Sequence, residues 1–268
     1  MKLDILSLDG GKVGSIELPK QFEEIKRPIL IRRAVEALQA NKRQQYGAHP
    51  EAGKGVSVRL SKRRRDYRTS YGYGISRVPR KILSRRGTRF NWEGAFAPHT
   101  KGGRRAHPPK AEKLWVRKIN KKENRKAIRS ALACTLDKEL VKARGHLIPD
   151  NYPFVVDEKF EAVDKVKKVK EAFEKIGLKK EMQRALRKNV RAGKGKSRGR
   201  KYKKKKSVLL VVSKACNLEK SAKNIPGIEV VAVSELNAEL LAPGAVPGRL
   251  TLFTKEALSR LEKEKLFM

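Results

Sequence analysis

The chain has 268 residues, with 66 Lys and Arg against 28 Asp and Glu, which gives a formal net charge of +38. This length has room for one large or two modest domains, but a compact body with this charge would repel itself strongly without a neutralising polyanion. The sequence has neither a long apolar span nor a basic amphipathic anchor, which excludes an anionic membrane as that polyanion and favours a nucleic acid.

Residues 1–45 predict the beginning of a globular body. The runs 3–8 and 13–18 flank a Gly-rich turn and indicate a β-hairpin. Pro28 then opens a helix whose apolar residues recur three and four positions apart on one face. No long apolar run precedes Pro19, and an acidic residue stands near the start, so we expect no signal peptide and a cytoplasmic location.

Residues 46–110 do not continue this pattern, because Gly and Pro interrupt the windows in which a helix or strand could run. They predict a long extended loop without regular secondary structure, inserted in the body and unable to fold alone. The stretch 42–110 holds 19 Lys and Arg against three acidic residues. Seven aromatic residues are interleaved with its arginines: Tyr46, Tyr67, Tyr71, Tyr73, Phe90, Trp92 and Phe96.

This composition is typical of an RNA-binding loop. Arginine suits bidentate recognition of phosphate, and aromatic rings stack on unpaired bases. The alternatives are a solvated charged loop or a nuclear-targeting cluster at 62–65. Disordered tails are poor in aromatic residues, so the loop is expected to make ordered contacts, and to order only when RNA supplies counter-charge and stacking surfaces.

Residues 111–268 return to the pattern of the body. Asn120, with a glutamate three residues on, matches a capping box and begins a long helix that we expect to continue until Gly145. A short strand at 154–156 and a helix at 166–176 follow.

A second basic element covers residues 178–206, with 15 Lys and Arg against Glu181 alone, and includes the Gly/Lys/Arg-rich segment 191–206. The two basic elements together leave a net charge of +8 for the other 170 residues, which is ordinary for a soluble domain. The positive charge is therefore concentrated in two parts of the chain.

The apolar runs at 207–212, 228–233 and 249–253 predict three further strands. Helices are expected to follow the last two, beginning at Ser234 and Thr254. The first run is continuously apolar, which is typical of a strand covered on both faces. Strands that alternate with helices predict an α/β fold, a mostly parallel sheet with helices on both faces in a Rossmann-like layering.

No catalytic or metal-binding constellation is found. Cys134 and Cys216 stand far apart without partners at metal-ligand spacing, and we expect Cys134 to be an ordinary buried thiol. The four histidines are expected to contact solvent or phosphate: His49, His99, His107 and His146. We therefore expect no enzyme, no cofactor and no metal.

Four motifs are more specific: YGYGISRVPR at 71–80, GAFAP at 94–98 followed by KGGRRAHPPK at 101–110, KAIRSALA at 126–133, and RAGKGKSRGRKY at 191–202. With these the chain resembles, over nearly its whole length, the family of the fourth protein of the large ribosomal subunit in its archaeal and eukaryotic form. The end at Met268, without the long tail of eukaryotic members, favours the archaeal form.

The resemblance implies an α/β body on the outer face of the large subunit. It also implies that residues 46–110 thread through ribosomal RNA to the wall of the peptide exit tunnel, with the tip between Gly72 and Phe96. The implied partners are large-subunit ribosomal RNA and neighbouring ribosomal proteins, including the other extended-loop protein of the tunnel. A homo-oligomer and a membrane partner are not expected.

The predicted RNA-binding residues are basic side chains and the Gly and Tyr residues beside them: Arg63, Arg64, Arg65, Tyr71, Gly72, Tyr73, Gly74, Arg77, Arg80, Arg85, Arg86, Arg89, Lys101, Gly102, Gly103, Arg104, Arg105, Lys110, Lys196, Arg198 and Arg200. One alternative is an RNA-modifying or RNA-processing enzyme that uses the loop as a substrate clamp, which would need an acidic, His or Cys centre. Another is a basic RNA annealer without a fixed site, which would not require a regular apolar core.

Overall fold

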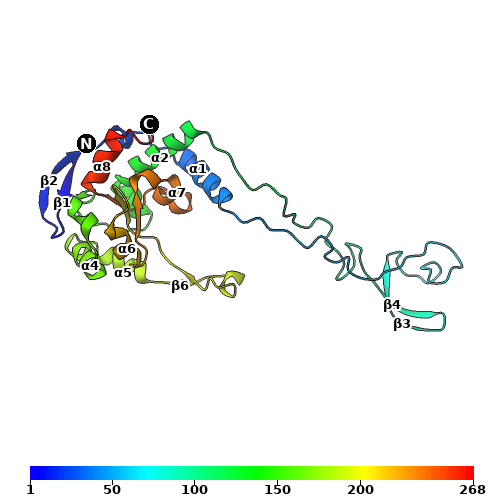
Figure 1. The fold of residues 1–268 in the computed structure, drawn as a ribbon. Helices are drawn as coiled ribbons and strands as arrows, with labels where there is room; N and C mark the ends of the chain where they lie inside the picture. The colour runs from blue at the N-terminus through cyan, green and yellow to red at the C-terminus, as the bar shows by residue number, and fades with distance from the viewer. The chain divides into compact units, whose positions relative to one another are not determined.

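The computed structural model describes the whole chain, residues 1–268, and divides it into two compact units (Figure 1). Met1–Lys42 together with Val116–Met268 form the first unit, which we call the body, and Arg43–Trp115 form the second, which we call the arm. The boundaries predicted from the sequence lie within five residues of these. No helix is long and apolar enough to cross a membrane.

The body contains two three-stranded sheets. In the first, β1 (Lys2–Leu6) pairs antiparallel with β2 (Lys12–Glu17), which confirms the predicted hairpin, and parallel with β5 (Val155–Val156). The second sheet is entirely parallel, with the strand order β10-β8-β9. Its strands are β8 (Leu209–Val212), β9 (Glu229–Ala232) and β10 (Thr251–Phe253). A parallel bridge between Val156 and Thr254 links β5 to the residue that follows β10.

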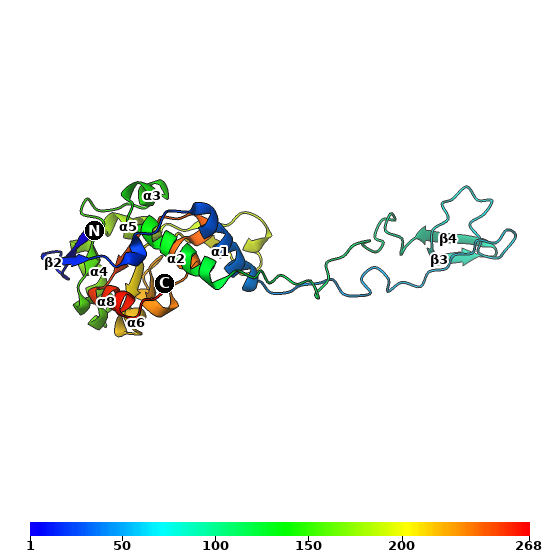
Figure 2. The same cartoon turned by 90° about the horizontal axis from the view of Figure 1, so that it is seen from above.

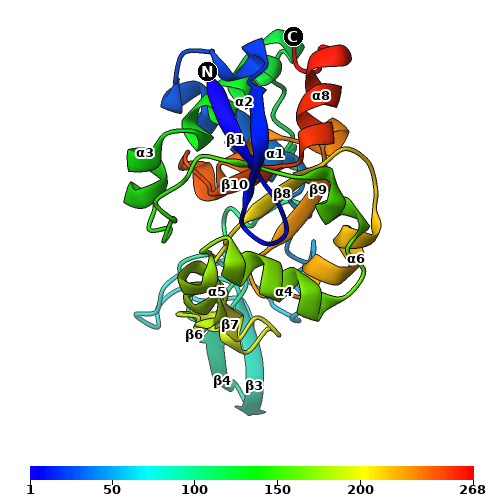
Figure 3. The same ribbon diagram turned by 90° about the vertical axis from the view of Figure 1, so that its left-hand side faces the viewer.

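Helices cover both faces of β8, because its side chains alternate between two apolar clusters (Figure 3). Leu209 and Val211 join one cluster with four helices: α1 (Pro28–Asn41), α2 (Lys121–Thr135), α7 (Ala238–Leu241) and α8 (Lys255–Lys263). Leu210 and Val212 join the other with α4 (Val166–Lys175) and α6 (Asn217–Lys223). All four residues of β8 are buried, as predicted. Cys134 is buried in the first cluster, and burial raises the pKa of its thiol, so it is the expected structural thiol.

The predicted long helix after Asn120 is wrong in two respects. It begins where expected, but the Asn120 side chain makes no capping hydrogen bond. It also ends at Thr135, and a separate helix α3 (Lys138–Ala143) follows. The Asp137 carboxylate accepts hydrogen bonds from the backbone N–H groups of Glu139 and Leu140 at 3.0 and 3.4 Å, so it caps α3 and starts a new helix.

The predicted helix start at Thr254 is confirmed, because its hydroxyl accepts a hydrogen bond from the N–H of Ala257. The predicted start at Ser234 is wrong. A 3-10 turn, Val233–Glu235, follows β9, and α7 begins only after Asn237, whose side chain accepts a hydrogen bond from Leu240 at 3.0 Å. Further 3-10 turns lie at Lys20–Phe22, Glu158–Ala162 and Pro243–Ala245.

The second basic element begins with α5 (Lys179–Leu186). After α5 the chain forms a small extension of the body. Strands β6 (Asn189–Val190) and β7 (Tyr202–Lys203) pair antiparallel, and a 3-10 turn, Lys194–Lys196, lies between them.

The arm contradicts the prediction of a loop without regular secondary structure. Strands β3 (Arg80–Arg86) and β4 (Arg89–Gly94) pair antiparallel as a hairpin. The Gly and Pro residues that argued against strands surround this stretch, whereas from 80 to 93 only Gly87 interrupts it, and Gly87 occupies the turn with φ 57°. A short hairpin therefore fits inside a segment that is otherwise broken by Gly and Pro.

Two runs of the arm lie side by side between its ends and this hairpin (Figure 2). The N–H of Ala48 donates to the carbonyl of Pro109 at 2.9 Å. A Cβ atom on Gly47 would lie 2.5 Å from the backbone nitrogen of Ala111, so only glycine allows this close approach. We call these paired runs, residues 46–53 and 104–115, the stalk.

Candidate nucleic-acid interface

The basic side chains of the arm have almost no acidic partners within it. Lys81 and Glu93, 3.4 Å apart, form the only salt bridge of the arm. The predicted phosphate-binding residues there are mostly exposed: Arg63, Arg64, Arg65, Arg77, Arg85, Arg86, Arg89, Lys101, Arg105 and Lys110. This leaves a dense, uncompensated positive charge on the surface of the arm.

The YGYG motif forms a turn that is followed by two of the predicted arginines. Gly72 and Gly74 have φ values of 80° and 65°. The guanidinium of Arg77 lies 4.3 Å from the centroid of the Tyr71 ring. Arg80 donates to the carbonyl and the hydroxyl of Ser76 at 3.0 Å each. These contacts fix the directions of both guanidinium groups within the arm.

Gly103 has a structural role within the arm, and its predicted role in RNA binding stays a prediction. A Cβ atom there would overlap the carbonyl oxygen of Ala97 and the hydroxyl of Thr100, so this glycine serves a turn of the arm itself. Gly102, at φ 70°, has open space around it and remains available for close approach by a ligand. Arg105 is exposed, whereas Arg104 is half-buried, with its backbone N–H directed to the carbonyl of Phe96 at 3.4 Å.

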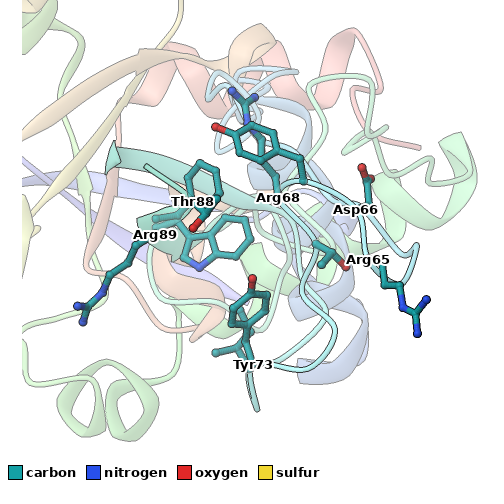
Figure 4. A pocket seen from close by; sticks show the side chains of 11 residues that line it. Arg65, Asp66, Arg68, Tyr73, Thr88 and Arg89 are labelled. Carbon is teal, nitrogen blue, oxygen red and sulfur yellow. The ribbon is translucent and has the colours of Figure 1, made fainter. Parts of the chain in front are cut away.

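A cavity of about 510 Å³ lies beside the hairpin of the arm (Figure 4). It brings together three predicted residues, Arg65, Tyr73 and Arg89. Arg68 lines it too, with three of the loop aromatics expected to stack on bases but left out of the list of predicted RNA-binding residues: Tyr67, Phe90 and Trp92. The rings of Phe90 and Trp92 stack at 5.3 Å, and Tyr67 meets Phe90 edge-on at 5.2 Å. The alternation of Phe90 and Trp92, which places both rings on one face of a strand, is the sequence signal that could have found them.

The body carries a second, separate basic surface. The predicted residues Lys196, Arg198 and Arg200 lie between β6 and β7, and all three are exposed. A cavity of about 790 Å³ at the base of this extension is lined by Arg144, Arg184 and Arg187 together with the lysines at 203–206. Sequence reasoning missed Arg144, because it lies outside both basic elements.

The expectation for His146 is wrong, because this side chain is buried and not in contact with solvent. Its Nδ1 lies 2.8 Å from the carboxylate of Glu181, which also accepts hydrogen bonds from Arg184, Ser207 and the N–H of Leu147. Burial opposes ionisation of Glu181, but these donors outweigh it and lower its pKa to about 2. Burial also lowers the pKa of His146. The hydrogen bonds of Glu181 connect α5 to residues 146–147, which follow α3, so His146 and Glu181 have a structural role.

Comparison with known proteins supplies the family. The model of the ribosomal protein L4/L1 family matches residues 16–264. Large ribosomal subunit protein uL4 of Nanoarchaeum equitans is 51% identical over 268 residues, all of both chains. The uL4 proteins of Archaeoglobus fulgidus and Methanococcoides burtonii are 48% and 45% identical, each across 97% of this chain and 98% and 97% of their own lengths.

These matches confirm the resemblance based on the four motifs, and they give no support to the RNA-modifying alternative. The chain therefore belongs to the ribosomal protein L4/L1 family and is a structural constituent of the large ribosomal subunit, not an enzyme.

Proposed function

We propose that the arm binds large-subunit ribosomal RNA and reaches the wall of the peptide exit tunnel, while the body docks at the surface of the subunit. The observation that supports this most strongly is the charge of the arm, in which Lys81 and Glu93 form the only salt bridge. So many exposed cations, held close together without counter-charge, are best neutralised by the phosphates of a folded RNA.

The predicted RNA-binding residues then have two kinds of role. The exposed arginines and lysines contact phosphates, except Arg85 and Arg86 beside the hairpin turn, and the YGYG turn brings Tyr71 and the guanidinium of Arg77 forward as one stacked unit. Lys196, Arg198 and Arg200 provide a second point of attachment on the body. These assignments explain why the two basic elements of the sequence fall on exposed extensions of chain.

The tunnel-facing part is the turn of the β3–β4 hairpin, between Arg86 and Arg89. It lies inside the predicted tip, residues 72–96, and its residues are exposed. The neighbours we propose are other large-subunit proteins, including the second extended-loop protein of the tunnel. The chain works as a single copy in the cytoplasmic ribosome.

The body supplies rigidity for this attachment. We propose that its strands act as one mostly parallel, Rossmann-like sheet, supported by the parallel pairs β1–β5, β10–β8 and β8–β9 and by the bridge between Val156 and Thr254. Only β2 runs antiparallel to its neighbour in these sheets.

The test is the salt dependence of binding to large-subunit ribosomal RNA. Each phosphate neutralised steepens the fall of log K with log salt, by about 0.9 on duplex DNA and by less on single strands. The full chain should give a steep slope, and a chain with residues 46–110 replaced by a short Gly/Ser linker should give a much shallower one. An unchanged slope would place the RNA contacts in the body.

A further inference from the structure

We propose that the cavity beside the hairpin of the arm is a pocket for one unpaired ribonucleotide, whose base stacks on the aromatic rings while arginines bind its phosphates. The inference rests on the proposed function, because it needs the arm to bind RNA. It goes further by naming one nucleotide-sized site, with a base-dependent contact, within an interface otherwise based on charge.

The lining of the cavity offers a stacking surface. Phe90 and Trp92 stack on each other at 5.3 Å with an interplanar angle of 27°, so they form a short aromatic stack that an inserted base can extend. Tyr73 stands apart from them in Figure 4, where its ring lies below the other aromatic side chains. It is 66% exposed and forms no aromatic pair, which leaves its ring free to contact an inserted base. Base–aromatic stacking is how proteins hold unstacked RNA bases.

The rim of the cavity carries charge suited to phosphate. Arg65 and Arg89 extend outward on opposite sides in Figure 4, so they can reach the backbone on either side of an inserted nucleotide. Arg68 lies between them, with its guanidinium 5.2 Å from the Tyr67 ring centroid. The Nε–H of Arg68 is buried without a hydrogen-bond partner, so this side chain has a donor that the arm itself does not satisfy.

The backbone beside the cavity is held in an unusual conformation. Arg65 and Arg68 have φ values of 54° and 68°, in the left-handed region that non-glycine residues rarely adopt. Asp66 lies between them, and its carboxylate is hydrogen-bonded to the hydroxyl of Ser61, which lowers its pKa. In this strained loop, the carboxylate of Asp66 is therefore occupied by a hydrogen bond, and the arginines are directed to the rim of the cavity. Strained backbone is common at binding sites.

Other ligands fit this cavity less well. Its volume of about 510 Å³ is in the range of small-molecule sites and admits a whole nucleotide. A cationic ligand, which aromatic cages otherwise attract, would be repelled by Arg65, Arg68 and Arg89. An apolar side chain would bring no counter-charge to the three arginines that line the cavity. A flat, anionic ligand suits both the rings and the charge.

The experiment uses the full chain with Trp115→Phe, which leaves Trp92 as the only tryptophan. The probes are three short RNA hairpins that differ at one position: a bulged adenosine, an abasic bulge, and no bulge. We expect the bulged adenosine to quench Trp92 fluorescence and to bind about 5- to 100-fold more tightly than the abasic probe, the range that stacking on one base gives. Equal affinities for these two probes, with equal quenching, would overturn the pocket.

Two tyrosines of one turn provide a matched pair of variants. Tyr73→Leu should remove most of the preference for adenosine over the abasic bulge, because Tyr73 lines the cavity. Tyr71→Leu should weaken all three probes alike and keep that preference, since Tyr71 lies outside the cavity against Arg77. Because Tyr73 is largely exposed, its replacement leaves folding intact. The same loss of preference in both variants would show that the cavity is not the site.

The outcomes separate this proposal from the proposed function. If the pocket is wrong but the arm binds RNA, all three probes bind equally and with a steep salt dependence. If the arm does not bind RNA at all, no probe binds in a manner that depends on residues 46–110.

Discussion

At the scale of single residues, the arginines of the arm differ in what holds them in place. Arg85 donates to the hydroxyl of Tyr67 at 2.5 Å near the hairpin turn, whereas Arg104 and Arg105 follow the Gly102 turn, where an RNA phosphate can approach closely. Positions that look equivalent in a basic sequence therefore have different neighbours. This difference can be tested by comparing two pairs of arginines.

The double variant Arg104→Ala with Arg105→Ala should weaken incorporation into large subunits, because removing a charge-assisted hydrogen bond to phosphate costs roughly 1.5–3 kcal/mol. Arg85→Ala with Arg86→Ala should leave incorporation nearly intact but alter the passage of nascent chains, since these residues stand near the proposed tunnel-facing turn. The measurements are occupancy in purified subunits and ribosome pausing. Equal loss of occupancy in both variants would contradict the assignment of the tip.

In the body, Glu181 is the residue whose loss should cost most stability. Glu181→Gln removes the charge that Arg184 and His146 face, and breaking a buried ion pair costs about 3–5 kcal/mol. Glu174→Gln is the matched control, because its salt bridge to Lys179 is exposed and should change the free energy of unfolding by less than about 1 kcal/mol. Chemical denaturation of the three proteins measures both values.

The same group determines how stability depends on pH. Because the pKa of Glu181 falls from 4.5 to about 2 on folding, its stabilisation is complete above pH 4.5 and is lost as the pH falls towards 2. The pKa of His146 is also lowered from 6.5, so protonation of the unfolded chain costs stability below pH 6.5. The difference in Tm between wild type and Glu181→Gln should therefore shrink between pH 4.5 and 2. A constant difference would contradict the lowered pKa of Glu181.

At the scale of elements, the stalk depends on glycine where its two runs touch. Gly47→Ala would bring a Cβ atom to 2.5 Å from the nitrogen of Ala111 and break the hydrogen bond between Ala48 and Pro109. Loss of one such bond, about 1 kcal/mol, should weaken RNA binding roughly fivefold. Gly55→Ala has open space around it and should bind as wild type does. The dissociation constants for ribosomal RNA measure the contrast, and equal values would mean that the stalk opens in the complex.

Much of the body could be predicted from the sequence because its elements follow hydrophobic periodicity. The hairpin β1–β2 and the helix α1 appear where alternation and the 3.6-residue repeat place them. The break between α2 and α3 was missed because the apolar stripe continues through it, and only the capping geometry of Asp137 reveals it. Hydrophobic periodicity indicates which residues are buried, but it does not indicate where a helix ends.

The arm was harder to predict for a different reason. Its hairpin is short, and the Gly and Pro residues around it dominate the local sequence pattern. The aromatic cavity depends on Tyr67 meeting Phe90 from another part of the arm, a contact that spacing along the chain does not encode. The burial of His146 was missed for a similar reason, because its partner Glu181 is 35 residues away.

At the scale of the whole molecule, the two apolar clusters explain why the body and the arm can be considered separately. Neither cluster includes a residue between Arg43 and Trp115. A chain with residues 46–110 replaced by a Gly/Ser linker should therefore keep a folded body that unfolds cooperatively on heating. Circular dichroism during a thermal scan tests this, and a broad, non-cooperative transition would show that the arm contributes to the core.

The central claim is that the unpaired positive charge of the arm attaches this protein to ribosomal RNA. The most direct measurement is the occupancy of the linker-replaced chain in large subunits purified by sedimentation through a high-salt sucrose gradient, compared with the full chain. We expect the full chain to remain with the subunit and the linker-replaced chain, although folded, to be largely lost. Equal occupancy of the two chains would contradict the claim and assign the attachment to the body.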